Sequence, residues 1–317
     1  MAILIYKLPL VFRPQAMVSK DISQRFILEH SNIRGELTRL QESYKQVLEN
    51  GDYHPVVKKL LGELMAASVL LSSTLKFKGQ LSIQARGDGY LKMIMAECRN
   101  DKHIRAIAHV AKNQQPPKAT ETNLRKLLGK GQLAITIQPD KGKQYQGVVP
   151  LGNDSIASSI ENYFKRSEQI PTRLFLFCQF GRAGGMLLQM LPQQNSSENT
   201  AQGPKLWDRA CALGNTLSSE ELLTMPSERM LHRLYNGDEV RLFNETPVLF
   251  DCRCNQERTQ RALLALHSDE LKEILSSKES VSVQCQFCGT DYEFSKHEIE
   301  NLLNPQIHQD GTGSLLH

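Results

Sequence analysis

The chain has 317 residues, of which 40% are apolar and 23% are charged, and its formal net charge at pH 7 is +4. Such a chain can bury a sizeable core, so it is expected to form about two domains, and a wholly disordered protein is excluded. It has no uncharged apolar run of the roughly 18 residues that a membrane-spanning helix needs, so no membrane partner is expected.

The apolar N-terminal segment is a poor match to a secretory signal peptide. Lys7 and Pro9 interrupt it, no basic region precedes it, and no small-residue cleavage site follows it. Met17 is an internal methionine that stands just before the patterned part of the chain. Residues 1–16 are therefore expected to be a non-native or upstream-start extension, and the folded core is expected to begin near residue 17.

Two helices are predicted next. Residues 33–50 place six apolar side chains on one helical stripe, and Gly51 supplies a C-terminal stop. The stripe consists of Ile33, Leu37, Leu40, Tyr44, Val47 and Leu48. Pro55 can open a second helix, which becomes apolar on nearly every side beyond Leu64. This second helix is therefore predicted to be buried.

From residue 81 the apolar period changes from that of a helix to that of a strand. Residues 81–85 and 91–95 alternate apolar and polar side chains around the turn Gly87-Asp88-Gly89, which predicts a hairpin. Further strands are predicted at 104–110, 133–137, 173–180 and 186–191, with one helix at about 154–169. Strands in runs with short turns indicate an α+β domain over 17–192, with a largely antiparallel sheet packed with helices.

Residues 193–250 are predicted to be a flexible and helical linker. The stretch 193–203 is polar and of low complexity. Ser218 and Glu221 have the spacing of a capping box, and Pro226 separates that helix from one around 227–235. No second sizeable core is expected here. The apolar residues of this segment could either dock on the sheet domain or be exposed; they are Leu206, Trp207, Leu213, Leu217, Leu222, Leu223, Met230, Leu231 and Leu234.

The C-terminal segment contains two close cysteine pairs. Cys252 and Cys254 are followed, after thirty residues, by Cys285 and Cys288. Four thiolates brought together by a short fold supply the ligand set of a structural zinc site, and Gly289 can take the turn conformation of a metal knuckle. An odd total of seven cysteines, four of them in close pairs, favours a reducing compartment, so a cytoplasmic location is expected.

A zinc ion would explain how so short a segment folds. About 50–60 residues rarely bury a self-sufficient core, whereas zinc contributes on the order of 10 kcal/mol to such a module. His267 and His297 could replace a thiolate, but surface histidines are the simpler interpretation. We therefore expect a small zinc-binding α+β module over 251–304, with helices at 258–266 and 269–277, a strand at 281–283, a last helix beginning near Ser295, and a tail over 305–317.

Cysteine spacing alone leaves the role of the metal open. Most four-cysteine zinc sites are inert structural sites. A zinc-bound thiolate is nevertheless a nucleophile that peroxide can reach when the site is exposed. Because oxidation removes the ligands, a module held together by metal would then unfold, which is the behaviour of a redox switch.

Several motifs in the right order resemble the heat-shock protein 33 family. The cysteine segment, with Phe250 and Asp251 before the first pair and Gly289, Tyr292 and Phe294 after the second, is similar to that family's redox switch. The resemblance runs from about residue 20 to 300. The upstream motifs that agree are Arg34-Gly35-Glu36-Leu37, Thr74-Leu75-Lys76-Phe77, Tyr145-Gln146-Gly147-Val148-Val149, the stretch from Tyr163 to Thr172, and Ala183-Gly184-Gly185-Met186-Leu187-Leu188-Gln189.

The resemblance implies an ATP-independent holding chaperone of the stress response, not an enzyme, that is inactive while reduced and bound to one zinc ion per chain. Under oxidative stress, usually with heat, Cys252 would pair with Cys254, and Cys285 with Cys288. Zinc would be released, the switch domain and the linker would unfold, and the exposed surface would bind unfolding client proteins. Oxidised members of the family tend to dimerise, so a homodimer is expected in that state.

Two other functions compete with this one, a zinc-ribbon nucleic-acid-binding protein and a metalloenzyme or thiol oxidoreductase. Residues 251–317 carry 6 basic and 11 acidic side chains, net −5, which leaves +9 for residues 1–250. The metal segment therefore lacks the positive charge that phosphate contacts need, and no nucleic-acid partner is expected. Four protein ligands leave zinc no open position for water, and Cys285-x-x-Cys288 lacks the strand-to-helix setting of a redox motif. No catalytic residue is predicted.

Overall fold

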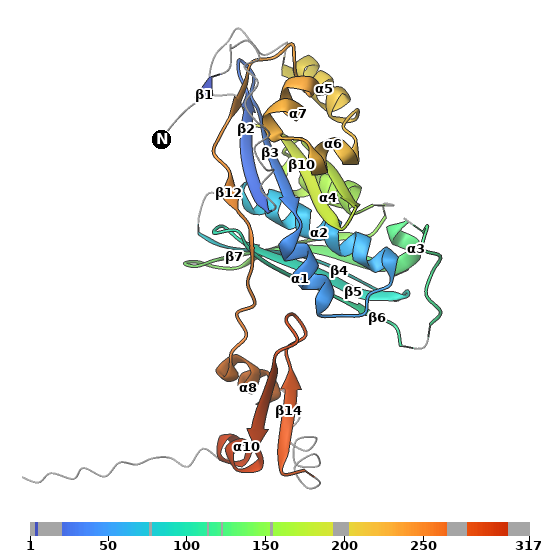
Figure 1. The fold of residues 1–317 in the computed structure, drawn as a ribbon, viewed down its shortest axis with the longest axis vertical. Coiled ribbons are helices and arrows are strands. Elements are labelled where there is room, and N and C mark those ends of the chain that lie inside the picture. Colours follow the sequence, from blue (N-terminus) through green and yellow to red (C-terminus); the bar gives the residue numbers. More distant parts are fainter. Residues whose placement is uncertain are drawn as a thin grey trace, which may run out of the picture. The chain divides into compact units, whose positions relative to one another are not determined.

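A computed structural model describes residues 4–5, 21–75, 78–112, 114–121, 123–152, 155–192, 203–264 and 278–303. The chain divides into two compact units, Met1–Asp251 and Cys252–His317, whose secondary structure is drawn in Figure 1. The architecture is α+β, as the sequence indicates, although the N-terminal unit contains two sheets and not one. Within the described ranges, no helix is long and apolar enough to cross a membrane.

The first sheet of the N-terminal unit has seven strands among the described residues, and all of its pairs are antiparallel. Its order is β1 (Leu4–Ile5), β11 (Val240–Leu242), β2 (Ile22–Leu28), β3 (Ile33–Leu40), β10 (Arg182–Met190) and β9 (Thr172–Gln179), and β12 (Thr246–Pro247) also pairs with β2. The two strands predicted late in the core domain are confirmed as β9 and β10. Strands β11 and β12 come from the predicted linker, so part of that segment is built into this sheet.

The second sheet has six strands in the described part of the unit. Its order is β13 (Leu249–Phe250), β6 (His103–Val110), β5 (Leu91–Arg99), β4 (Gly79–Gly87), β7 (Gly131–Pro139) and β8 (Tyr145–Pro150). All pairs are antiparallel except β13, which runs parallel to β6. The predicted hairpin and the strands predicted at 104–110 and 133–137 are confirmed.

Helix α2 (Pro55–Ser72) lies between the two sheets and contacts strands of both (Figure 1). Burial of fourteen of its 18 residues explains why its sequence is apolar on nearly every side, as predicted. The helix predicted at 154–169 is confirmed as α4 (Ile156–Tyr163), which continues into the π-helical turn η1 (Phe164–Glu168). Two shorter helices are α1 (Glu42–Glu49) and α3 (Leu124–Leu128).

The helix predicted over residues 33–50 is wrong in its first half. Residues 33–40 form strand β3, and only residues 42–49 are helical. The spacing of Ile33, Leu37 and Leu40 imitates a helical stripe, but in the strand Ile33 and Leu37 pack into one apolar cluster and Leu40 into another, on the opposite face. Because both faces of β3 are covered, its apolar residues do not alternate with exposed polar ones.

The start of α1 is capped by a side chain from another part of the chain. The Asp21 carboxylate accepts the backbone N–H groups of Gln41, Glu42 and Ser43 at 2.6, 2.8 and 2.7 Å. The first N–H groups of a helix have no partner within the helix, so a carboxylate that accepts three of them stabilises its beginning. The boundary between β3 and α1 is therefore fixed by a contact across 20 residues of sequence.

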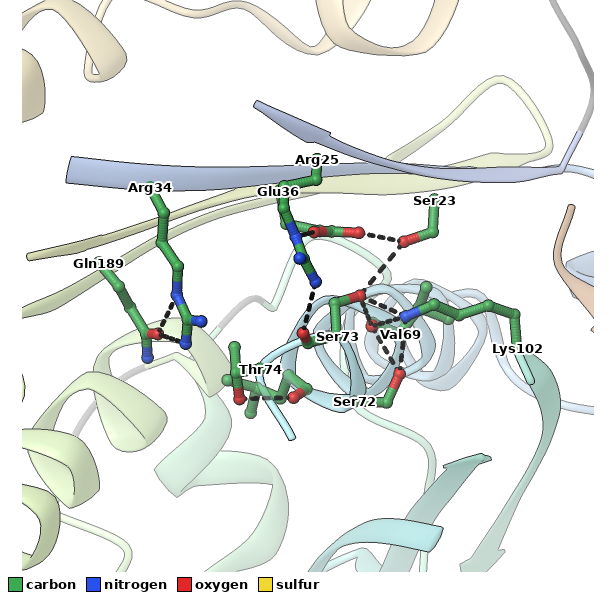
Figure 2. A network of polar contacts seen from close by, with 11 residues as sticks. Ser23, Arg25, Arg34, Glu36, Val69, Ser72, Ser73, Thr74, Lys102 and Gln189 are labelled. Atoms are coloured by element: carbon green, nitrogen blue, oxygen red, sulfur yellow. Dashed lines mark hydrogen bonds and ion pairs between the residues drawn. The ribbon is translucent and has the colours of Figure 1, made fainter. Parts of the chain in front are cut away.

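The C-terminal end of α2 is closed by a buried lysine (Figure 2). Lys102, in the turn between β5 and β6, is 6% exposed, and its Nζ donates to the Val69 carbonyl at 3.3 Å, to Ser72 Oγ at 3.0 Å and to Ser73 Oγ. A cation at this end of a helix satisfies its last carbonyls and opposes its dipole. These bonds tie α2 to the second sheet.

A second set of polar contacts ties the same helix end to the first sheet (Figure 2). The buried Glu36 carboxylate accepts from Ser23 Oγ at 2.6 Å and lies 3.6 Å from Arg25 Nε. Arg25 Nη2 in turn donates to the Ser73 carbonyl at 3.1 Å. The charge of Glu36 is thus compensated inside the unit, as buried charges require.

Three helices of the predicted linker cover the face of the first sheet opposite α2 (Figure 1). They are α5 (Gly203–Gly214), α6 (Ser219–Thr224) and α7 (Ser227–Leu234). The capping box between Ser218 and Glu221 is confirmed. The helices have no core of their own but complete one with the sheet, in which Phe26, Ile33, Leu37, Met186 and Leu188 meet Leu217, Leu222, Leu223, Met230 and Leu231. Of the two arrangements open to these apolar residues, this structure has the docked one. Residues 193–202 lie outside the described residues.

The C-terminal unit is small. It contains α8 (Gln256–Leu264), the antiparallel pair β14 (Ser280–Gln284) and β15 (Asp291–Ser295), and α10 (Lys296–Leu303). The strand predicted at 281–283 and the helix predicted after Ser295 are confirmed, and α8 begins two residues before the predicted helix at 258–266. The helix predicted at 269–277 lies outside the described residues. The described core consists of Leu263, Phe294 and Ile299.

Candidate metal centre

Two short segments of the C-terminal unit supply four sulfur atoms. Cys252 and Cys254 precede α8, and Cys285 and Cys288 lie in the connection between β14 and β15. That connection is a tight turn, because the Gly289 N–H donates to the Cys285 carbonyl and the Cys285 N–H to the Thr290 carbonyl, both at 2.8 Å. Gly289 has a φ of +71°, so the glycine takes the left-handed conformation that the sequence predicted for a metal knuckle.

The four sulfurs converge. They all lie within 4.8 Å of one another, with Cys252 Sγ 3.6 Å from Cys285 Sγ and Cys254 Sγ 3.2 Å from Cys288 Sγ. Zinc–sulfur bonds of about 2.3 Å at tetrahedral angles place sulfur atoms roughly 3.8 Å apart. Four half-buried thiols at these separations therefore fit zinc in both donor type and spacing. They are the only group of three or more potential metal ligands that converges in this way within the described ranges.

Two side chains that sequence reasoning gave no role contact the sulfurs. Tyr292 Oη donates to Cys254 Sγ at 3.1 Å, and Thr290 Oγ1 lies 3.3 Å from Cys288 Sγ. Hydrogen bonds of this kind orient metal ligands and tune their basicity. The spacing of Tyr292 after the second cysteine pair was part of the motif, and this is the only sequence signal that could have identified it.

The thiols differ in acidity. Burial raises the pKa of Cys252. Burial also raises the pKa of Cys254, although the hydrogen bond from Tyr292 opposes it. Burial would raise the pKa of Cys288 as well, but hydrogen bonds with Thr290 and then with the neighbouring cysteines lower it to about 7. Since the thiolate is the form that binds metal, the lowered pKa of Cys288 favours its metal-binding form near neutral pH.

Histidine does not take part in the described cluster. His297 lies on α10, where its Nε2 is 3.1 Å from Asn301 Nδ2, and it is not among the converging ligands. His267 lies outside the described residues. The potential ligands that converge among the described residues are thus Cys252, Cys254, Cys285 and Cys288, and their binding of zinc stays a prediction.

The other three cysteines lie in the N-terminal unit, as free thiols. Cys98 is fully buried and donates to Ser72 Oγ at 3.3 Å, whereas Cys178 and Cys211 are half-buried. Burial raises the pKa of Cys178 and of Cys211 to about 11, so both remain protonated thiols near neutral pH and react slowly with oxidants.

We therefore expect Cys98→Ala, Cys178→Ala and Cys211→Ala to leave metal binding intact, with a loss of stability of about 1 kcal/mol for the buried Cys98. Zinc content per chain, measured on each reduced variant, checks this expectation. A variant of this set that bound no zinc would show that the ligand set is not the one described.

Comparisons with known proteins agree on one family. The family model described as "Hsp33 protein" matches residues 21–295. Relatives named 33 kDa chaperonin are 40% identical over 290 residues in Hahella chejuensis (91% of this chain, 99% of the relative), 39% over 304 residues in an Enterobacter species (92% and 100%), and 38% over 287 residues in Pseudomonas aeruginosa (90% and 95%). The crystal structure of the 33 kDa chaperonin of Thermotoga maritima has a similar fold, with a TM-score of 0.74 and 21% identity over 89% of this chain and 97% of that one.

Proposed function

Because the chain belongs to the Hsp33 family of chaperones, we propose that it is a redox-regulated holding chaperone that uses no ATP. In the reduced form, Cys252, Cys254, Cys285 and Cys288 hold one zinc ion and the protein is inactive. In the oxidised form it binds unfolding proteins and prevents their aggregation. The observation that carries this proposal is the convergence of four thiols in a unit whose described core has three buried apolar side chains.

Cys252 and Cys254 before α8, and Cys285 and Cys288 in the β14–β15 turn, would hold the ion, and their shared binding would cross-link the two segments. Each disulfide forms when two thiols lose two electrons and two protons to peroxide, which is reduced to two molecules of water. The sulfurs of a disulfide no longer serve as thiolate ligands, so oxidation removes both the metal and the cross-link. A unit with so small a core then has too little buried apolar area to remain folded.

The pairing of the cysteines is proposed from the family resemblance, as Cys252–Cys254 and Cys285–Cys288. The two shortest sulfur separations, 3.6 and 3.2 Å, lie between a cysteine of the first pair and one of the second. All four sulfurs lie within 4.8 Å of one another, so the geometry is compatible with disulfides within the pairs or between them. Peptide mapping of the oxidised protein by mass spectrometry distinguishes the adjacent pairing from the crossed one.

Unfolding client proteins are the proposed partners, and the docked linker is the proposed source of the surface that binds them. Its helices bury leucine and methionine side chains against the first sheet, and such side chains adapt to many partners once exposed. We further propose a cytoplasmic location, a homodimer in the oxidised state, no nucleic-acid partner and no enzymatic activity.

The test combines three measurements on one sample. We expect peroxide at raised temperature to release one zinc ion per chain, to remove four free thiols, and to produce a protein that suppresses the aggregation of a thermally unfolding client enzyme without ATP. The reduced sample at the same temperature is the control. The proposal is wrong if the oxidised protein loses its zinc and four thiols but leaves client aggregation unchanged.

A further inference from the structure

A buried arginine of the first sheet donates three hydrogen bonds to the junction between α6 and α7, and Arg182 on β10 donates a further one, to the Leu223 carbonyl at 3.3 Å. Arg39 lies on β3 and is 4% exposed. Its Nε donates to the Leu222 carbonyl at 2.7 Å, its Nη2 to the Met225 carbonyl at 2.7 Å, and its Nη1 to Ser227 Oγ at 3.1 Å. The last carbonyls of a helix have no partner within the helix, so Arg39 supplies the donors that the end of α6 lacks.

The hydrogen-bond partners of Arg39 are all neutral. No ion pair joins Arg39 to a carboxylate within the described residues, and burial lowers its pKa to about 10, with Glu245 opposing the shift through space. The guanidinium is therefore charged at neutral pH and depends on linker groups for its hydrogen bonds. Undocking of α6 breaks these three hydrogen bonds, and the loss of the charge-assisted bonds opposes the undocking.

A second feature of the same junction is a glycine directly opposite Arg39. Gly184 on β10 is the register partner of Arg39 on β3. A Cβ at Gly184 would lie 2.7 Å from the Thr38 carbonyl oxygen, 3.0 Å from Leu223 Cδ2 and 3.3 Å from Leu222 Cδ2. The two leucines of α6, which are 0% and 2% exposed, thus pack where a side chain at position 184 would otherwise lie.

We propose that Arg39 and Gly184 form a latch that holds α6 and α7 on the sheet, and that this latch sets how readily the chaperone is activated. The latch is one cross-strand pair, in which Arg39 donates three hydrogen bonds to the junction and Gly184 leaves room for Leu222 and Leu223 of α6. Weakening it releases the linker while zinc is still bound. This inference rests on the proposed function, and it assigns a regulatory contact within the N-terminal unit, to which none of the four clustered cysteines belongs.

The test compares latch variants with a variant that weakens the same unit elsewhere. Arg39→Met keeps an unbranched side chain, shorter than that of arginine by two heavy atoms, and removes every donor. Gly184→Ala adds a methyl group that meets the Thr38 carbonyl oxygen as well as both leucines. Arg39→Lys keeps the charge and one donor group. Ile135→Ala is the control, because Ile135 is buried in the second sheet and belongs to the other apolar cluster.

In reduced, zinc-loaded protein we expect Arg39→Met and Gly184→Ala to raise amide hydrogen exchange over residues 219–234 at least tenfold, while β4 and β5 exchange as in the wild type. The same samples should suppress client aggregation without peroxide, with Arg39→Lys between them and the wild type. Ile135→Ala should lower the thermal stability of the unit without either effect.

Two results would overturn the latch. One is unchanged exchange over 219–234 in both latch variants, and the other is Ile135→Ala activating the reduced protein as strongly as Arg39→Met. Oxidised wild-type protein is included in each assay. If it fails to protect the client, the proposed function is wrong, but the hydrogen-exchange result still decides whether Arg39 and Gly184 hold the linker.

Discussion

Replacement of Cys285 by serine is expected to unfold the C-terminal unit of the reduced protein while the N-terminal unit stays folded. The described core of the C-terminal unit contains three buried apolar side chains, Leu263, Phe294 and Ile299. Structural zinc contributes on the order of 10 kcal/mol to modules of this size, which exceeds what so small a core supplies. Loss of one of the four thiolates weakens zinc binding, and with it the contribution of the ion to folding.

Hydrogen exchange over residues 278–303 and zinc content per chain measure this result directly. We expect full exchange of β14 and β15 within the shortest labelling time, and the same exchange in wild-type protein treated with a chelator. Cys211→Ser is the matched control, since that cysteine is half-buried but lies in the other unit. Protected β14 and β15 amides in metal-free protein would show that the unit folds without its ion.

The parts of this structure that could be predicted from sequence are those whose residue pattern is compatible with only one kind of local structure. Cysteine spacing predicted the meeting of Cys252 and Cys254 with Cys285 and Cys288, because close pairs separated by a short fold have few other arrangements. Apolar runs predicted α2 and the hairpin of β4 and β5, because each of these elements repeats with its own period.

Strand β3 was misassigned because both of its faces are buried. Glu36, Thr38 and Arg39 are between 0% and 6% exposed, although charged and polar residues are usually placed on the surface by sequence reasoning. Their burial depends on partners distant in sequence, such as Ser23 for Glu36 and Leu222 for Arg39. These partners lie outside the short stretch of sequence over which apolar periodicity is read. The contacts proposed to make Arg39 regulatory could not be predicted from sequence for the same reason.

Gly35→Val is expected to lower the stability of the N-terminal unit by about 3 kcal/mol, and its melting temperature by roughly 5–10 °C. Gly35 on β3 is the register partner of Phe26 on β2, and a Cβ there would lie 2.0–2.6 Å from three atoms of the Phe26 ring. The ring has little freedom to move, because it is fully buried and packs against Tyr235 with 6.2 Å between ring centroids. Calorimetry of the reduced, zinc-loaded protein measures the change.

Whether Gly35→Val lowers or raises the stability shows whether side-chain packing or intrinsic strand propensity dominates at this position. Valine favours strands more than glycine does, so propensity alone predicts that the substitution in β3 stabilises the protein. Gly152→Val is the control, because a Cβ at Gly152 meets no atom within 4 Å. Adding Phe26→Leu should recover part of the stability lost in Gly35→Val, because the smaller side chain vacates the space that the valine occupies. A Gly35→Val protein as stable as the Gly152→Val control would mean that the Phe26 ring does not need the glycine beside it.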